Sequence, residues 1–331
     1  MKDYKGVLIY GEPVTDKLSG STCELIEAGR RIASDLGQEV ACVLTGDLSS
    51  DVLADAAARG AVTIYTAAST ATAPLDSDGH LTVAMTAVQQ AMPAVILMGH
   101  TPVGRELGPR LAFRLGTAVT TDCIDVKIDA NTGRLVTTKP VYGGNALADL
   151  LTHCSPQIAT IRPKAMAAGE PASGAQPNII ELPVDLPPSR LTVKDRVQEE
   201  VVGVKLEDAP IIVSGGRGVC GPEPFTTTLK DLADALHGVV GASRPACDNG
   251  WAPESMHIGL TGKIVAPELY VAVAISGASQ HMSGCSSAKT IVAINKDAEA
   301  NIFREAAFGV VGRFEDVVPA FTAKLRELLA D

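Results

Sequence analysis

A glycine-rich segment in the second half of the chain is the first candidate for chemistry. Gly216-Arg217-Gly218-Val219-Cys220-Gly221 satisfies the pattern GxGxxG directly after an apolar run that ends at Val213. Glycines in this pattern let the backbone approach a pyrophosphate at the start of a helix, which is consistent with dinucleotide binding. Pro222 and Pro224 delay that helix, so a simple tight turn stays open as an interpretation. Arg217, placed between two of the glycines, could bridge a pyrophosphate.

Short polar segments follow other apolar runs in the same half of the chain. They are Ser276-Gly277-Ala278-Ser279-Gln280-His281, Gly241-Ala242-Ser243-Arg244, Gly259-Leu260-Thr261-Gly262, and Asn295. Open α/β sheets bind ligands at the carboxyl ends of their strands, where these donors would lie. Taken singly, the serine or threonine fits a helix cap and the histidine fits a buried strand end. Four such segments in one domain favour a single extended polar ligand.

The first half of the chain predicts a mostly parallel sheet. Apolar runs at 7–10, 40–45, 62–65 and 94–98 alternate with helical patterns, which is the rhythm of βαβ units. Ser21 and Glu24 have the spacing of a capping box at the start of a helix that runs to about Leu36. Asn131-Thr132-Gly133 lies between two short alternating segments and predicts a hairpin, so we expect an antiparallel extension of the sheet.

A change of composition divides the chain. Residues 165–188 are rich in Ala, Gly and Pro, and charged residues follow. Alternation resumes with predicted strands at 210–213, 269–275 and 290–294 and predicted helices near 225–236 and 317–329. At 331 residues the chain is long enough for two cores. We predict an N-terminal α/β domain over 1–190 and a smaller, Rossmann-like (doubly wound) C-terminal domain over 191–331.

Charge and hydropathy exclude several kinds of partner. A net charge of -10 and a pI near 5.1 argue against binding to nucleic acid. The longest apolar runs, such as 93–98, are far shorter than a membrane span, and the first five residues are too few and too polar for a signal peptide. We therefore expect a cytoplasmic protein that is not an integral membrane protein.

The cysteines and other reactive residues give no catalytic pattern. Seven cysteines are scattered without a CxxC pair, which predicts free, largely buried thiols and no metal site. No Ser-His-Asp order or metal-ligand spacing is present to work on a separate substrate.

The segments described above form a distinctive combination. Residues 269–281 (LYVAVAISGASQH), with Asn295, 213–218, 241–244 and 261–270, resemble the FAD-binding half of electron-transfer flavoprotein α (large) subunits. In the first half, 104–110, 121–123 and 140–145 are similar to the same family. The resemblance spans nearly the full chain, and it implies an electron carrier rather than an enzyme.

The resemblance also implies a set of FAD contacts. These are Arg217, Ser243, Ile258, Gly259, Leu260, Thr261, Ser276, Gly277, Ala278, Ser279, Gln280, His281 and Asn295, with Arg244 against the flavin ring and Arg313 and Phe314 as a further pair. A guanidinium such as Arg244, which keeps its proton, would stabilise an anionic semiquinone and raise the reduction potential. His281 would donate a hydrogen bond to the flavin pyrimidine carbonyl, and Thr261 would hydrogen-bond a ring nitrogen.

Three positions depart from the family pattern. Leu260 stands where the family commonly has Gln, and Arg313 stands where it often has Asp near the adenine end. Cys247 and Asn249 follow Arg244 at positions where the family commonly has small or acidic residues. Cys247 could place a thiol near the flavin or a small apolar side chain in the core, and we expect it in the core. The adenine contact is therefore open.

Partners follow from the resemblance as well. It implies a smaller β subunit against which the first domain packs, acyl-CoA-type dehydrogenases as electron donors, and a quinone reductase or another acceptor. Some members of the family bifurcate electrons through a second FAD in the β subunit.

Two other functions stay open from the residues. An NAD-dependent oxidoreductase with His281 as acid-base catalyst would need an acidic residue about 20 positions after the glycines, and 237–242 offers none. A flavin-less interaction subunit would have no use for Arg217, Arg244 and His281.

Overall fold

The computed structural model describes residues 4–14, 17–67, 76–144, 146–172, 176–185, 194 and 204–329. The chain forms two compact units, the first made of Met1–Val141 and Ala146–Arg196 and the second of Tyr142–Asn145 and Val197–Asp331. The predicted boundary between 190 and 191 lies outside the described residues. Each unit is α/β, as the alternation of apolar runs predicts.

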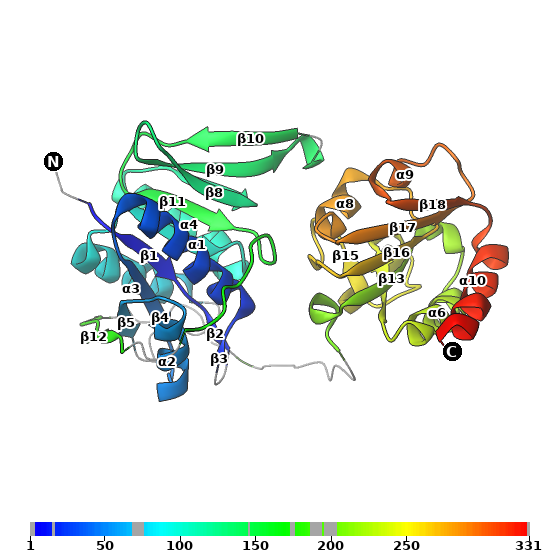
Figure 1. The fold of residues 1–331 in the computed structure, drawn as a ribbon, viewed down its shortest axis with the longest axis horizontal. Helices are drawn as coiled ribbons and strands as arrows, with labels where there is room; N and C mark the ends of the chain where they lie inside the picture. The colour runs from blue at the N-terminus through cyan, green and yellow to red at the C-terminus, as the bar shows by residue number, and fades with distance from the viewer. Residues whose placement is uncertain are drawn as a thin grey trace. The chain divides into compact units, whose positions relative to one another are not determined.

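The first unit is built on a parallel seven-stranded sheet of order β12-β5-β4-β1-β6-β11-β7 (Figure 1). Its strands are β1 (Val7–Tyr10), β4 (Val40–Thr45), β5 (Thr63–Ala67), β6 (Val95–Gly99), β7 (Val119–Cys123), β11 (Gln157–Ile161) and β12 (Asn178–Glu181), and β2 (Pro13–Val14) pairs with β3 (Lys17–Leu18) beside it. The helices are α1 (Gly20–Leu36), α2 (Ser50–Ala58), α3 (Ser77–Ala91) and α4 (Pro102–Leu115).

Alternation along β1 gives this sheet two buried faces. Val7 and Ile9 pack into the core under α1 and α2, whereas Leu8 and Tyr10 pack into a second core under α3 and α4. The predicted parallel sheet is thereby confirmed.

The predicted hairpin is also confirmed. β8 (Asp125–Asp129) pairs antiparallel with β9 (Arg134–Val141), and β9 pairs antiparallel with β10 (Ala146–Leu151). These strands form a separate three-stranded sheet of order β10-β9-β8, and within the described residues none of them pairs with a strand of the seven-stranded sheet. The predicted antiparallel extension of that sheet is therefore wrong. Gly133 takes a left-handed φ of 64° in the turn, which a residue without a Cβ adopts at little cost. A 3-10 turn, η2 (Tyr142–Gly144), follows β9.

The start of α1 differs from the prediction. The N-cap is Ser19, whose Oγ accepts a hydrogen bond from the backbone N–H of Thr22 at 3.1 Å, so the predicted capping box at Ser21 is wrong. The Glu24 side chain does not cap the helix N-terminus. Its side chain is buried and accepts a hydrogen bond from the backbone N–H of Lys164 at 2.8 Å.

The second unit contains a six-stranded parallel sheet of order β15-β14-β13-β16-β17-β18. The strands are β13 (Ile211–Gly215), β14 (Val239–Ser243), β15 (His257–Ile258), β16 (Leu269–Val273), β17 (Thr290–Asn295) and β18 (Phe308–Val311). The helices are α5 (Glu223–Thr226), α6 (Thr228–Ala235), α7 (Arg244–Asp248), α8 (Ser279–Cys285), α9 (Ile302–Glu305) and α10 (Phe314–Leu329), with 3-10 turns η3 (Leu206–Asp208), η4 (Arg217–Val219) and η5 (Glu254–Met256).

This sheet is doubly wound, as predicted. Val213 and Val271 pack into a core with α6 and α10, which lie side by side (Figure 1), whereas Ile212 and Tyr270 pack into a second core with α8. The single helix predicted near 225–236 is two helices. The chain breaks at Thr227, whose φ of -119° and ψ of -93° are not helical.

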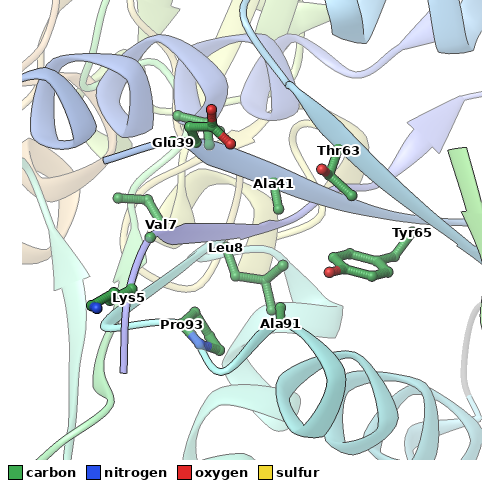
Figure 2. A pocket seen from close by; sticks show the side chains of 11 residues that line it. Lys5, Val7, Leu8, Glu39, Ala41, Thr63, Tyr65, Ala91 and Pro93 are labelled. Atoms are coloured by element: carbon green, nitrogen blue, oxygen red, sulfur yellow. The ribbon is translucent and has the colours of Figure 1, made fainter. Parts of the chain in front are cut away.

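A small pocket of about 130 Å³ opens at the amino ends of β1, β4 and β5 (Figure 2). Lys5, Glu39, Thr63 and Tyr65 are among the residues that line it, and none of its lining residues is a predicted site residue. Ligands of open α/β sheets bind at the opposite, carboxyl edge.

Among the described residues, no helix has the length and apolar character needed to cross a membrane.

Candidate cofactor site

The connections of the second sheet create a switch point between β13 and β16. From β13 the chain moves outward through β14 to β15, and then it returns to β16 on the other side and moves outward through β17 to β18. This strand order, 3-2-1-4-5-6, is that of dinucleotide-binding domains, in which neighbouring loops diverge at the switch point and leave a crevice at the carboxyl edge. The fold therefore predicts a ligand where β13 and β16 end.

The glycine-rich segment lies at this point and packs on the loop after β16. Gly216 N–H donates to Val273 O at 2.9 Å and Gly218 N–H donates to Ala274 O at 3.3 Å. Arg217 between them is exposed. The segment forms the turn η4, and the first helix after it, α5, has only four residues, so the glycines do not open a long helix as a conventional fingerprint does.

The loop after β16 and the first turn of α8 carry six of the predicted contacts. Ser276, Ala278 and Gln280 are exposed, whereas Gly277 is buried with a φ of 78°. A Cβ at Gly277 would lie 2.2 Å from the backbone nitrogen of Ile302, so only glycine fits there. The loop thus presents polar groups outward over a closely packed glycine.

Two further predicted segments end on the same edge. Ser243 is buried at the N-terminus of α7, but its side chain makes no capping hydrogen bond, so the alternative interpretation as a helix cap is not supported. Arg244 is 62% exposed and lies 3.5 Å from Asp248. No acidic residue ends β14, where a nicotinamide-binding domain would hold the ribose, which weighs against the NAD interpretation.

The predicted residues after β15 form a tight turn. Gly259 has a φ of 153°, and Gly262 N–H donates to Gly259 O. Leu260 and Thr261 are exposed on this turn, and Leu260 N–H donates to Gln280 O at 2.7 Å. The turn and the first turn of α8 are therefore neighbours, although Ile258 itself is fully buried.

Asn295, Arg313 and Phe314 belong to a pocket of about 370 Å³ farther along the edge, which Gly218, Cys220 and Lys296 also line. Asn295 Nδ2 donates to Ile275 O at 2.9 Å and its Oδ1 accepts from Asp297 N–H at 3.0 Å, which joins the ends of β16 and β17. Arg313 is exposed and lies 3.3 Å from Glu315, whereas Phe314 is buried in the core.

His281 is one of two buried polar residues among the predicted contacts, the other being Ser243. Its Nε2 lies 2.9 Å from the hydroxyl of Tyr270, and burial lowers the pKa of the imidazole to about 4, so the ring is neutral. Its Nδ1 is buried and has no hydrogen-bond partner within the described residues. Tyr270 was not a predicted site residue, because a tyrosine in an apolar strand indicates only the core.

The cysteines agree in part with the prediction. All seven are free, and Cys23, Cys42, Cys123 and Cys285 are buried, but Cys154 and Cys220 are exposed. Cys247 packs partly against the core, as expected. Within the described residues no group of His, Cys, Asp or Glu side chains could hold a metal ion.

These features fit the FAD that the resemblance implies. Glycines at 216 and 277 allow close backbone packing under loops that carry exposed hydroxyl, amide and guanidinium groups, the donor types that a pyrophosphate and a flavin need. The buried Nδ1 of His281 is a polar atom without a hydrogen-bond partner among the residues that the structure describes.

Comparison with known proteins agrees with this interpretation. Residues 7–187 match a family model described as electron transfer flavoprotein domain, and residues 205–286 match one described as electron transfer flavoprotein FAD-binding domain. The chain is 39% identical to electron transfer flavoprotein subunit alpha of Bacillus subtilis, over 98% of each chain. It is 38% identical to the Thermoanaerobacterium thermosaccharolyticum subunit, over 99% of this chain and 100% of the relative, and 35% identical to that of Megasphaera elsdenii, over 99% and 98%. This chain therefore belongs to the family of electron transfer flavoprotein alpha subunits, which bind FAD and carry electrons.

Proposed function

We propose that this chain holds FAD along the carboxyl edge of β13 to β17 through the sixteen predicted contacts, and carries electrons as the larger subunit of a heterodimer. The observation that supports this most strongly is the position of the contacts. Segments spread from Arg217 to Phe314 lie on loops or element ends at one edge of one sheet. In this proposal the domain of residues 1–190 packs against the smaller β subunit, and the complex works in the cytoplasm.

The cofactor supplies the redox chemistry when it is bound, and the protein supplies charge and position. Arg244 carries a permanent positive charge, which favours negative charge on a nearby reduced cofactor. Within the described residues its ion-pair partner is Asp248, on the same helix and largely exposed, so little of the charge is neutralised. Arg244 thereby raises the reduction potential.

In this proposal the other contacts bind the FAD and orient it. Arg217, exposed at the switch point, suits a bidentate contact with the pyrophosphate. The pocket beside Asn295 and Lys296 suits the adenosine end, where Arg313 replaces the acid that the family often has. Ser276 and Gln280 suit hydrogen bonds to the middle of the molecule.

The electron donors in this proposal are dehydrogenases of the acyl-CoA type, acting directly or through a second flavin in the β subunit. The acceptor is a quinone reductase or another redox protein. These partners rest on family membership, and the site itself selects for FAD rather than for a second substrate.

Stepwise anaerobic reduction of the purified heterodimer tests the proposal. The wild-type complex should contain flavin, and Arg244→Ala should keep the fold but lower the flavin potential. The control is Arg30→Ala, because Arg30 is equally exposed at 61% and is paired with Glu27 in the first unit. A colourless wild-type complex, or equal potentials for the two variants, would contradict the proposed function or the assigned role of Arg244, respectively.

A further inference from the structure

The pocket beside Asn295 contains an acid that is not one of the predicted contacts. Glu315 lines this pocket of about 370 Å³ together with Lys296 and Arg313. It lies in the first turn of α10, and its side chain is 49% exposed, so a ligand in the pocket can reach its carboxylate. Among the lining residues that the structure describes, Glu315 is the one acid.

The surroundings of Glu315 keep its side chain ionised and able to accept further hydrogen bonds. Nη2 of Arg313 donates to Oε1 of Glu315 at 3.3 Å. A backbone hydrogen bond at Glu315 itself lowers the pKa of the carboxyl below its ordinary value, and the bond from Arg313 adds to this effect. A carboxylate has about four lone-pair positions, so these contacts leave it with acceptor capacity. Its direction is fixed, because an ionised carboxylate only accepts.

The other polar side chains of the pocket are less suited to accept. Lys296 and Arg313 carry only donors. Asn295 is already engaged, since its Nδ2 donates to one backbone carbonyl and its Oδ1 accepts from Asp297 N–H. Gly218 and Gly312, which have no side chains, also line the pocket. A ligand group that donates hydrogen bonds therefore finds its charged acceptor in Glu315.

The ribose of an adenosine has such donors in its two hydroxyl groups. In dinucleotide-binding sheets an acidic side chain accepts from a ribose hydroxyl, and here no acid ends β14 to do so. We propose that Glu315 accepts hydrogen bonds from the ribose hydroxyls of the adenosine half of FAD, and that this contact selects a ribonucleotide in the pocket. This inference rests on the proposed function, which puts the adenosine end of the cofactor there.

Arg313 takes a second role in this arrangement. It stands where the family often has Asp, and Glu315, two positions later, returns a negative charge to the same pocket. The hydrogen bond between their side chains keeps the carboxylate beside the guanidinium. Arg313 is thus a positioning residue for Glu315.

Asp316 supplies a matched control for Glu315. It is exposed and lies in the same first turn of α10, but it is not among the lining residues of the pocket. Asp316→Ala removes the same charge from the same helix end as Glu315→Ala does. Only Glu315→Ala removes an acceptor from the pocket.

The experiment titrates ADP, and the dideoxy analogue of ADP that lacks both ribose hydroxyls, against bound FAD in the complex with the partner subunit. Flavin fluorescence reads the displacement, so only the FAD site reports. The wild-type complex should prefer ADP to the analogue roughly tenfold, as expected for hydrogen bonds to a charged acceptor. Glu315→Ala should lose this preference, and Asp316→Ala should keep it. The flavin potential should be the same in all three proteins, because the ribose contact does not touch the flavin ring.

Two outcomes would overturn the inference. One is a wild-type complex that does not distinguish the two nucleotides, and the other is a preference that survives Glu315→Ala. An equal loss in Asp316→Ala would assign the effect to charge at the helix end, and would overturn it as well. A wild-type complex that binds no FAD would instead overturn the proposed function, and direct calorimetric titration with the two nucleotides would then still decide the ribose contact.

Discussion

Gly216 lies directly against the backbone of Ala274. A Cβ on Gly216 would lie 2.1 Å from the carbonyl oxygen of Ala274, closer than any real contact, and Ala274 itself has a left-handed φ of 54°. The two loops that leave β13 and β16 therefore touch at the switch point, and they can do so only because residue 216 has no side chain.

Gly216→Ala should destabilise the second unit, because backbone on both sides must move to admit the methyl group. We expect a loss of about 2–3 kcal/mol in the free energy of unfolding, measured in urea, together with loss of flavin. The control is Gly221→Ala, where an added Cβ would meet nothing within 4 Å. Equal stability of the two variants would show that the loops do not pack as described.

Cofactor binding should protect one exposed thiol and leave another reactive. Cys220 lines the pocket beside Asn295, whereas Cys154 is exposed in the first unit. Alkylation followed by mass spectrometry should modify both in protein stripped of flavin and mainly Cys154 after FAD is restored. Unchanged labelling of Cys220 by FAD would argue against the adenosine end lying in this pocket.

Asn295→Asp should loosen the link between the ends of β16 and β17. An aspartate can accept from Asp297 N–H but cannot donate to Ile275 O, so we expect about 1–2 kcal/mol of lost stability and roughly tenfold weaker FAD binding. Fluorescence titration with FAD measures the affinity. Asn301→Asp adds the same charge at an exposed residue without a capping bond, and a similar loss there would indicate a charge effect alone.

Glu24 should make the stability of the first unit depend on pH. Burial raises its pKa from 4.5 to about 7, despite the hydrogen bond from Lys164 N–H, so the folded state binds a proton that the unfolded state has released. This group's contribution to stability is therefore present at low pH and is lost as pH rises from about 4.5 to about 7, by at most about 3 kcal/mol.

Glu24→Gln should remove that dependence of stability on pH, because an amide does not titrate. The amide oxygen can still accept the hydrogen bond from Lys164 N–H. Urea unfolding between pH 5 and 8.5 measures the effect, and the variant should be the more stable protein at pH 8. Glu27→Gln on the same helix is the control, because Arg30 lowers the pKa of Glu27 and places its titration below this window. A wild-type slope that survives Glu24→Gln would assign it to another group.

The sequence by itself determined the class and order of the elements and the general position of the site. Apolar runs with period two, separated by helical patterns, required two doubly wound sheets, since only that arrangement buries both faces of strands such as β1 and β16. Polar residues directly after those runs had to gather at one edge, because parallel strands end together. The glycines and Arg217 followed from local spacing alone.

The tertiary structure decided which side chains meet. Tyr270 and His281 are eleven positions apart on a strand and a helix, and no local pattern predicts that one would hold the other's ring. Ser19 and not Ser21 caps α1, because the helix begins directly after β3 of the short β2–β3 pair. The exposure of Cys220 and the burial of Glu24 depended on loops packed from elsewhere in the chain. Contacts of this kind depend on the rotation and separation of whole elements, which residue periodicity leaves undetermined.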